Sequence, residues 1–121
     1  MAIRIKESKL DAIEETETKG LMMLTITEKS EGLKLALELP EALATQFSAK
    51  EKIDVVIDDS PISNGDEARF YAEGNVFKAR LDEEVDVVGT LGGLRLVVEM
   101  DKVTAAKERI FTADRIYLAL F

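Results

Sequence analysis

The residue types that most often carry chemistry are missing from this chain of 121 residues, which contains neither histidine nor cysteine. Without histidine it lacks the commonest general base and the commonest ligand of transition metals. Without cysteine it has no thiolate nucleophile, disulfide or zinc–thiolate site. Catalysis would depend on carboxylates, lysines, tyrosines and hydroxyls, and most hydrolytic sites need more than these. We therefore expect no enzymatic activity and no cofactor or metal.

Two acidic clusters contain enough carboxylates to bind a hard cation or to form an acid–base pair. One is Asp58-Asp59 and the other spans Asp82–Asp86. Neither has the alternating Asp or Asn ligands around a central glycine that a calcium-binding loop requires. Carboxylates are also frequent along the whole chain, so we interpret both clusters as solvated turns.

The sequence VVGTLGGLRLVVE, residues 87–99, places three glycines within five residues, directly before an apolar run. A phosphate-binding loop would lead from such glycines into a helix, with a lysine and a hydroxyl residue following. Here the glycines lead into a β-forming segment instead. We therefore expect a structural role, in which they bend a barrel strand or let another backbone approach closely.

A β protein that binds single-stranded nucleic acid places aromatic and basic side chains on one face of its sheet. The candidates for such a face are Phe70, Tyr71, Phe77, Lys78, Arg80, Arg95 and Tyr117. The five phenylalanines and two tyrosines are few, and a net charge of −8 repels polyanions. Contact with nucleic acid is accordingly expected to be weak or indirect.

The N-terminal segment alternates charged and apolar residues and lacks the apolar core of a signal peptide. No run approaches the roughly 18 apolar residues that cross a bilayer. The absence of cysteine is typical of a reducing compartment. We expect a soluble, cytoplasmic protein that has no contact with a membrane.

Alternation of apolar and polar residues, which is typical of half-buried strands, is the dominant pattern. It is clearest in GLKLALELP, residues 32–40, and recurs at residues 3–5, 22–27, 53–57 and 94–100, and in the closing segment 116–121. Seven or eight short strands without alternating helices predict an all-β domain with minor helix, either an antiparallel barrel or a sandwich. The pattern alone does not distinguish these two architectures.

Several segments interrupt the alternation. A helix is expected only at Pro40–Phe47, with one further turn at Val103–Glu108. The polar stretches Asp11–Gly20 and Asp58–Glu67 are predicted to be loops. The uneven apolar phase around Glu73–Asn75 predicts a bulge or a tight turn.

Four apolar residues fall on the otherwise polar faces of their strands. They are Met23, Val56, Val97 and Phe121. Such residues indicate either a face that a partner covers or burial on both sides of the sheet within the domain.

Taken in order along the chain, several segments resemble the small eighth subunit shared by the eukaryotic nuclear RNA polymerases. The archaeal counterpart of that subunit, a small component of the archaeal DNA-directed RNA polymerase, is the closer match in length. The matching segments are residues 19–40, 52–61, 70–81, 89–99 and 113–121. The most specific pieces are Gly92-Gly93-Leu94 leading into a strand, Tyr71, Gly74 and Val76-Phe77 before it, and Arg115-Ile116-Tyr117-Leu118 near the end.

This resemblance implies a barrel of the oligonucleotide/oligosaccharide-binding (OB) type, spanning residues 1–121 as one domain. It also implies a non-catalytic subunit for structure and assembly, docked on the outer surface of the largest polymerase subunit. The polymerase's magnesium ions and catalytic aspartates belong to the large subunits. We expect the docking surface to include Tyr71, Gly92, Gly93, Leu94 and Arg95. The isolated chain is expected to be a monomer.

The chain differs from this family at one loop, and the sequence leaves two other classes of function open. The chain has only the short segment Ser60–Glu67 where the eukaryotic members have a longer loop, so single-strand contact by that loop is not expected. A free-standing single-stranded nucleic-acid-binding barrel would release oligonucleotides steeply as salt rises. A small enzyme or ligand-binding barrel would need an apolar cavity, and the missing histidine and cysteine argue against it.

Overall fold

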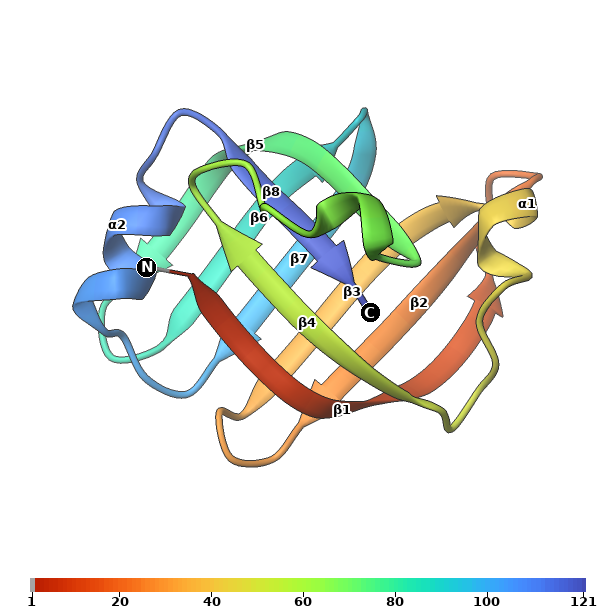
Figure 1. The fold of residues 1–121 in the computed structure, drawn as a ribbon, viewed down its shortest axis with the longest axis horizontal. Helices are drawn as coiled ribbons and strands as arrows, with labels where there is room; N and C mark the ends of the chain where they lie inside the picture. Colours follow the sequence, from red (N-terminus) through yellow and green to blue (C-terminus); the bar gives the residue numbers. More distant parts are fainter. Residues whose placement is uncertain (1) are drawn as a thin grey trace.

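The computed structural model describes residues 2–121, which form a closed antiparallel barrel and two short helices in a single small domain (Figure 1). The strands are β1 (Ile3–Glu15), β2 (Leu21–Glu28), β3 (Leu33–Pro40), β4 (Lys52–Asp58), β5 (Phe70–Leu81), β6 (Val85–Leu91), β7 (Leu94–Met100) and β8 (Ile116–Leu120). The helices are α1 (Glu41–Ala44) and α2 (Ala105–Phe111), and a 3-10 turn, η1, spans Gly65–Glu67. The order around the barrel is β1-β2-β3-β7-β6-β5-β8-β4. The predicted antiparallel barrel is confirmed, and its closure excludes the sandwich.

The apolar phase of each strand lies inside the barrel, as the alternation predicted. In β3 the inward leucines 33, 35, 37 and 39 are at most 2% exposed, whereas their outward neighbours are half-buried or exposed. Full burial of one leucine contributes about 1.5–3 kcal/mol. The inward residues of all eight strands join one continuous core, and this core holds the barrel closed.

The predicted loop at Asp11–Gly20 is wrong over its first half, because Asp11–Glu15 continue β1. Ile13 pairs with Leu24 and Glu15 pairs with Met22 on the neighbouring strand. Polar side chains that face solvent do not weaken backbone hydrogen bonding between strands. The many polar residues of this stretch therefore did not indicate a loop. The loop at Asp58–Glu67 is largely confirmed, since β4 ends at Asp58 and η1 is a single turn.

The bulge in β5 lies slightly later than Glu73–Asn75, where the sequence placed it. The register with β6 shifts between Val76 and Lys78. Phe77 is the extra residue of this bulge and turns outward, with 66% of its surface exposed. A bulge aims a side chain away from the regular alternation, which explains why the apolar phase is uneven here.

Both helices differ in length from their predictions. The first begins after Pro40, as expected, but α1 ends at Ala44 instead of Phe47 and has no side-chain cap at its N-terminus. The second begins two residues later than predicted and continues to Phe111. Its N-cap, Thr104, accepts a hydrogen bond from the Lys107 N–H at 3.2 Å, which favours the longer helix.

The glycines of the 87–99 segment have two separate roles, neither of which is the predicted bend of a strand. Gly92 and Gly93, with φ of +59° and +84°, form the two-residue turn that joins β6 to β7. Positive φ at both positions is the requirement of a type I′ hairpin turn. Gly89 lies within β6, where a Cβ would collide with the carbonyl oxygen of Asn75 on β5. That close approach of two backbones is the second of the roles predicted.

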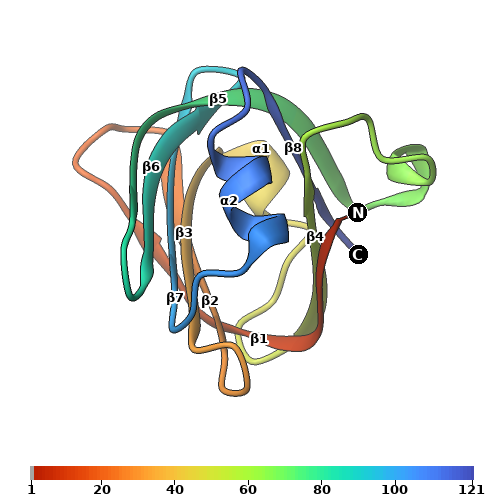
Figure 2. The same ribbon diagram turned by 90° about the vertical axis from the view of Figure 1, so that its left-hand side faces the viewer.

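The two ends of the barrel are covered differently. α2 lies across one mouth, and α1 lies at the opposite end, behind it in Figure 2. Within residues 2–121, no helix has the length and apolar character needed to cross a membrane.

Candidate partner-binding surface

The end of the barrel beneath α1 exposes part of the core. We call this surface, formed by α1, the β6–β7 hairpin and the adjoining inward side chains, the α1 end. Met22 and Leu94 belong to the inward phase, because they pair with the fully buried Leu39 and Leu91. Both are nevertheless only half-buried. Their incomplete burial shows that the four-residue α1 does not seal this mouth.

α1 places one apolar side chain outside the core. Ala44 and Phe47 are each 4% exposed and pack into the barrel, whereas Leu43 is 43% exposed. Leu43 precedes Ala44 by one position, so it lies on a different face of the helix from the buried side chain. The α1 end therefore presents Leu43 beside an incompletely covered core.

Arg69 fastens the segment that follows α1. Its guanidinium lies 4.5 Å from the centre of the Phe47 ring, and Nη2 donates to the Gln46 carbonyl at 2.6 Å and to Glu51 Oε1 at 2.8 Å. The hydrogen bond from Arg69 lowers the pKa of Glu51 below its ordinary value of 4.5. The Ser48 N–H, which donates to the same carboxylate at 2.9 Å, acts in the same direction. Polar contacts thus reinforce the packing of Phe47 in holding this segment against the barrel.

The β6–β7 hairpin brings four of the predicted site residues to the α1 end: Gly92, Gly93, Leu94 and Arg95. The Gly92 N–H donates to the Glu73 carbonyl at 3.2 Å, which fixes the turn against β5. The Arg95 N–H donates to Glu38 Oε1 at 3.2 Å. Among residues 2–121, the Arg95 guanidinium forms no ion pair. The hairpin therefore combines an apolar side chain with an exposed cation.

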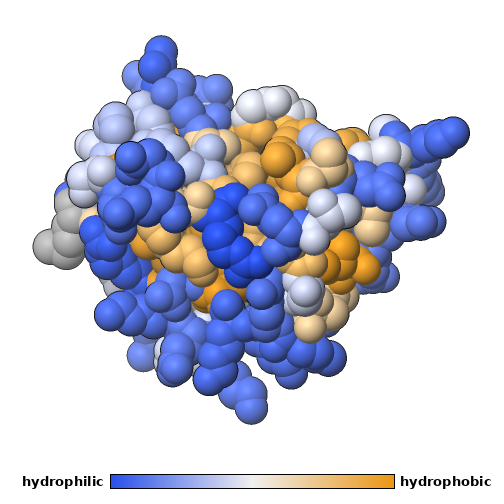
Figure 3. Space-filling view, turned by 45° about the vertical axis from the view of Figure 1, so that its right-hand side comes forward, coloured by the Kyte–Doolittle hydropathy of each residue, from blue (hydrophilic) through white to orange (hydrophobic). Residues whose placement is uncertain are grey.

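Figure 3 shows the molecule with this end brought forward. Hydrophobic residues gather across the middle and right of the view, with hydrophilic side chains crossing them and forming much of the rim. A small apolar area with a polar rim is the usual composition of a protein–protein interface. Exposed apolar surface rimmed by polar residues often marks an interaction site.

Tyr71, the fifth predicted residue, has its contacts elsewhere. Its hydroxyl accepts a hydrogen bond from the Ile62 N–H at 3.0 Å, and its ring stacks on Tyr117 with centroids 6.4 Å apart. A Cβ at Gly65 would collide with the Tyr71 ring at 2.7 Å. Tyr71 therefore anchors the connection between β4 and β5 to the outer wall. The structure does not join its side chain to the hairpin residues.

The four apolar residues that fall on the otherwise polar faces of their strands form two pairs. Val56 is 5% exposed in a second small cluster with Ile62 and Ala119, and Phe121 packs against this cluster. The β4–β5 connection contributes Ile62 to this cluster, so burial on both sides of the sheet is confirmed for Val56, whereas Phe121 is only half-buried. Met23 and Val97 are half-buried on the outer walls of β2 and β7.

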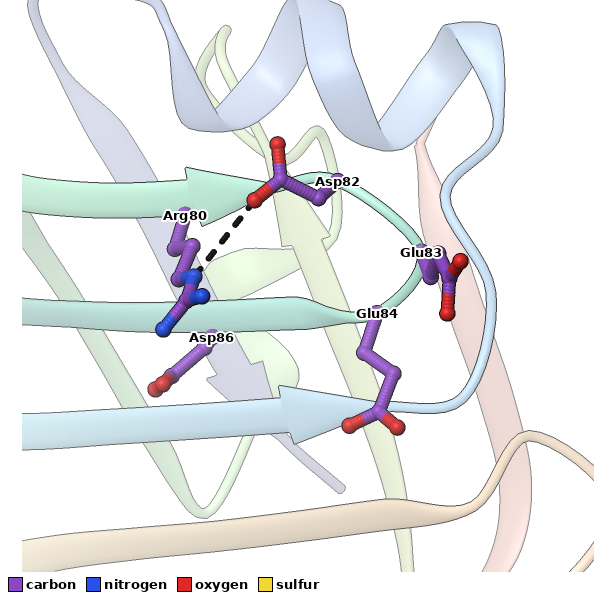
Figure 4. Close-up of a pocket in the computed structure, with 5 residues that line it drawn as sticks. All are labelled: Arg80, Asp82, Glu83, Glu84 and Asp86. Atoms are coloured by element: carbon purple, nitrogen blue, oxygen red, sulfur yellow. Dashed lines mark hydrogen bonds and ion pairs between the residues drawn. The ribbon is translucent and has the colours of Figure 1, made fainter.

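The acidic residues of the β5–β6 turn do not converge on one point. They line a shallow hollow of about 500 Å³ together with Arg80, whose Nε lies 3.4 Å from Asp82 Oδ2. Figure 4 shows the carboxylates of Asp82, Glu83 and Glu84 pointing in different directions. No group of three or more potential metal-ligating side chains is found in the described part of the chain. The geometry agrees with the interpretation of solvated turn residues.

The sequence predicted the hairpin residues as part of this candidate surface, but it did not predict Leu43 or Met22. Leu43 could have been recognised from the spacing of Ala44 and Phe47, which leaves it off the buried face of the predicted helix. Nothing in the sequence indicates that Met22 is exposed, because it alternates in step with the inward-facing residues of its strand. Its exposure depends on the length of the helix above it.

Comparison of the sequence with protein-family models finds none that matches, and comparison with curated proteins finds no match either.

Proposed function

We propose that this chain is a non-catalytic subunit of a DNA-directed RNA polymerase, which docks through the α1 end on the outer surface of the largest subunit. The observation that supports this most is the incompletely covered core at the α1 end, where Leu43 is exposed and Met22 and Leu94 are only half-buried, in an end of the barrel that also carries the exposed Arg95. An OB type of barrel, a cytoplasmic location and a monomeric state outside the assembly belong to the same proposal. The resemblance of the ordered sequence segments supplies the identity of the partner.

The chemistry of the chain supports a binding role over a catalytic one. The sequence has neither histidine nor cysteine, and the acidic side chains of the hollow at the β5–β6 turn diverge. A net charge of −8 is also unsuited to gripping a nucleic-acid backbone over a large surface.

Two substitutions at the hairpin test the proposal, Leu94→Asp and Arg95→Glu, each compared with the wild type for co-purification with the largest subunit. We expect both to reduce recovery, because one places a charge in the apolar contact and the other reverses the exposed cation. Undiminished recovery by two folded variants would show that the hairpin is not the docking surface.

A free-standing single-stranded nucleic-acid-binding barrel is the second candidate, and Phe77 favours it. This ring is 66% exposed, and Lys78 and Arg80 follow it on the same strand. An exposed aromatic ring near cations is the usual platform for base stacking. Oligothymidylate binding that is lost in Phe77→Ala and falls steeply with salt would favour this candidate.

A further inference from the structure

A basic hollow of about 490 Å³ lies on the outer wall of the barrel, over β1, the start of β4 and the β2–β3 turn. Its lining consists of Lys6, Glu7, Lys9, Thr27, Glu28, Lys29, Lys50 and Lys52. We call it the lysine hollow. Half of the chain's lysines line it, although the chain as a whole carries a net charge of −8. Positive charge is therefore concentrated at one place on an acidic protein.

The two carboxylates of the lysine hollow are already engaged. Glu28 accepts hydrogen bonds from the Ser30 hydroxyl and, at 2.8 Å, from the Glu31 N–H, and these bonds lower its pKa. Glu7 Oε1 lies 3.6 Å from Lys52 Nζ. Within the described residues, the remaining lysines of the hollow form no ion pair; they are Lys6, Lys9, Lys29 and Lys50. The hollow thus has cations that the chain itself does not neutralise.

The arrangement of the lysines opposes the stability of the sheet. Lys9 lies directly opposite Lys52 in the β1–β4 ladder, so both side chains project from the same face. Like charges in this position destabilise a strand pair. Packing within the barrel gives no reason for the pairing, since both residues are exposed.

The backbone is also unusual here. Between residues 2 and 121, positive φ occurs at two non-glycine residues, Glu7 at 55° and Lys50 at 75°, and both line the lysine hollow. Their amides are held in place, because the Glu7 N–H donates to Asp54 Oδ1 at 2.9 Å and the Lys50 N–H to the Leu10 carbonyl at 2.7 Å. Strained residues that the surroundings hold in this way gather at functional sites.

From these observations we propose that the lysine hollow binds a short acidic segment of a protein partner. The carboxylates of that segment would lie among the ammonium groups that have no partner within the chain. The contact is separate from the α1 end, and it does not rest on the polymerase assignment.

An acidic peptide suits the hollow better than a nucleic acid does. None of the described residues that line it is aromatic, so it offers no ring on which a base could stack. The chain as a whole carries a net charge of −8, which repels the phosphates of any strand that extends beyond the hollow. A polypeptide can instead confine its carboxylates to the few residues that contact the lysines.

The test is fluorescence anisotropy of the full chain with a labelled peptide of about eight residues, alternating glutamate and serine, which spans about 27 Å when extended. Salt is kept at about 50 mM, where the Debye length exceeds about 10 Å. A peptide with glutamine in place of glutamate and an oligothymidylate of equal length serve as comparison probes. The hollow variant is Lys9→Glu/Lys29→Glu, because neither lysine has an ion pair to lose. The control is Lys19→Glu/Lys102→Glu, which changes the net charge equally at exposed lysines elsewhere.

We expect the hollow variant to weaken binding of the glutamate peptide about tenfold or more and the control to change it less than about twofold. The glutamine peptide should not bind measurably. Circular dichroism and thermal unfolding establish that each variant is folded. Equal weakening in both variants, or no measurable binding by the wild type, would overturn the proposal. Tighter binding of oligothymidylate than of the peptide, lost in the hollow variant, would overturn it in favour of a nucleic-acid contact.

Discussion

At one end of the barrel, Ile110 and Phe111 of α2 are at most 1% exposed. At the other end, Leu43 of α1 is 43% exposed. The same sheet and the same core meet both helices, so the difference comes from the helices themselves. α2 has seven residues and a threonine cap, whereas α1 has four residues and no side-chain cap. The comparison shows that the two helices cover the barrel differently: α2 buries two large apolar side chains for stability, whereas α1 leaves its one large apolar side chain exposed to a partner.

The largest expected effect lies at the sealed end. Phe111→Ala should lower the free energy of unfolding by about 3–5 kcal/mol, because the ring is fully buried and its removal leaves a cavity. Urea denaturation followed by circular dichroism measures this loss. A loss below about 1 kcal/mol would mean that α2 can move away without cost, and the contrast between the two ends would then fail.

A smaller effect is expected at the ion pair that fastens α2 to the β2–β3 turn. Lys107 Nζ is bonded to Glu31 Oε1 at 2.8 Å and to the Lys102 carbonyl at 2.9 Å, and the lysine side chain is only 5% exposed. Glu31→Ala should lower the free energy of unfolding by about 1–3 kcal/mol, because it leaves a buried ammonium group without its counter-charge. Lys107→Met is the matched comparison and should cost less, since it removes the buried charge and retains an apolar chain. Equal losses in the two variants would show that desolvation of the lysine is not the cause.

At the open end, truncation should scarcely affect stability. Leu43→Ala is expected to change the free energy of unfolding by no more than about 1 kcal/mol, because the side chain is only partly buried. The same variant should weaken capture of the partner, since it removes an apolar contact. Denaturation and co-purification of one preparation measure both effects. A loss of stability comparable to that of Phe111→Ala would place Leu43 in the core after all.

Acid should loosen the α1 end through Glu51. Since Arg69 lowers the pKa of Glu51 in the folded state, the carboxylate stabilises the fold above its ordinary pKa of 4.5. This contribution is lost as pH falls through the lowered pKa. Glu51→Gln should therefore cost about 0.5–1 kcal/mol at neutral pH and progressively less as the solution is acidified below that ordinary value. Denaturation of both proteins across the pH range measures the difference, and a gap that persists in strong acid would rule out this linkage.

The smallest effect is expected at the lysine hollow. Like the exposed Leu43 of the α1 end, the positive φ of Lys50 is a feature that does not favour stability. Lys50→Gly should raise the free energy of unfolding by up to about 1 kcal/mol, because glycine adopts the φ of 75° without strain. Binding of the acidic peptide should fall in the same variant. Thermal unfolding measures the gain, with Lys78→Gly as the control at an exposed strand position, where glycine should destabilise. A loss of stability in Lys50→Gly would show that this backbone is not strained.

Much of the barrel could be predicted from the sequence, because strict alternation in segments such as Leu33–Leu39 has one structural interpretation. Closure could not, since a sandwich has the same alternation. The continuation of β1 through Glu15 was missed because outward polar residues resemble those of a loop. The role of Gly92 and Gly93 was misjudged because a turn and a bend both require glycine, and only the register of the flanking strands distinguishes them. In the candidate site, adjacency along the chain was enough to group the hairpin residues, whereas the exposure of Leu43 depends on where α1 ends.

The proposed function depends above all on the open end of the barrel being the docking surface. Affinity capture of tagged wild type, Leu94→Asp and Leu81→Asp from native extract at moderate salt, with mass spectrometry of the captured proteins, measures this directly. Leu81 is the matched control, because it is a half-buried leucine at the end of β5, away from the β6–β7 hairpin. We expect stoichiometric large polymerase subunits with the wild type and Leu81→Asp and their loss with Leu94→Asp. Undiminished recovery with Leu94→Asp, or no polymerase subunits with the wild type, would contradict the proposed docking.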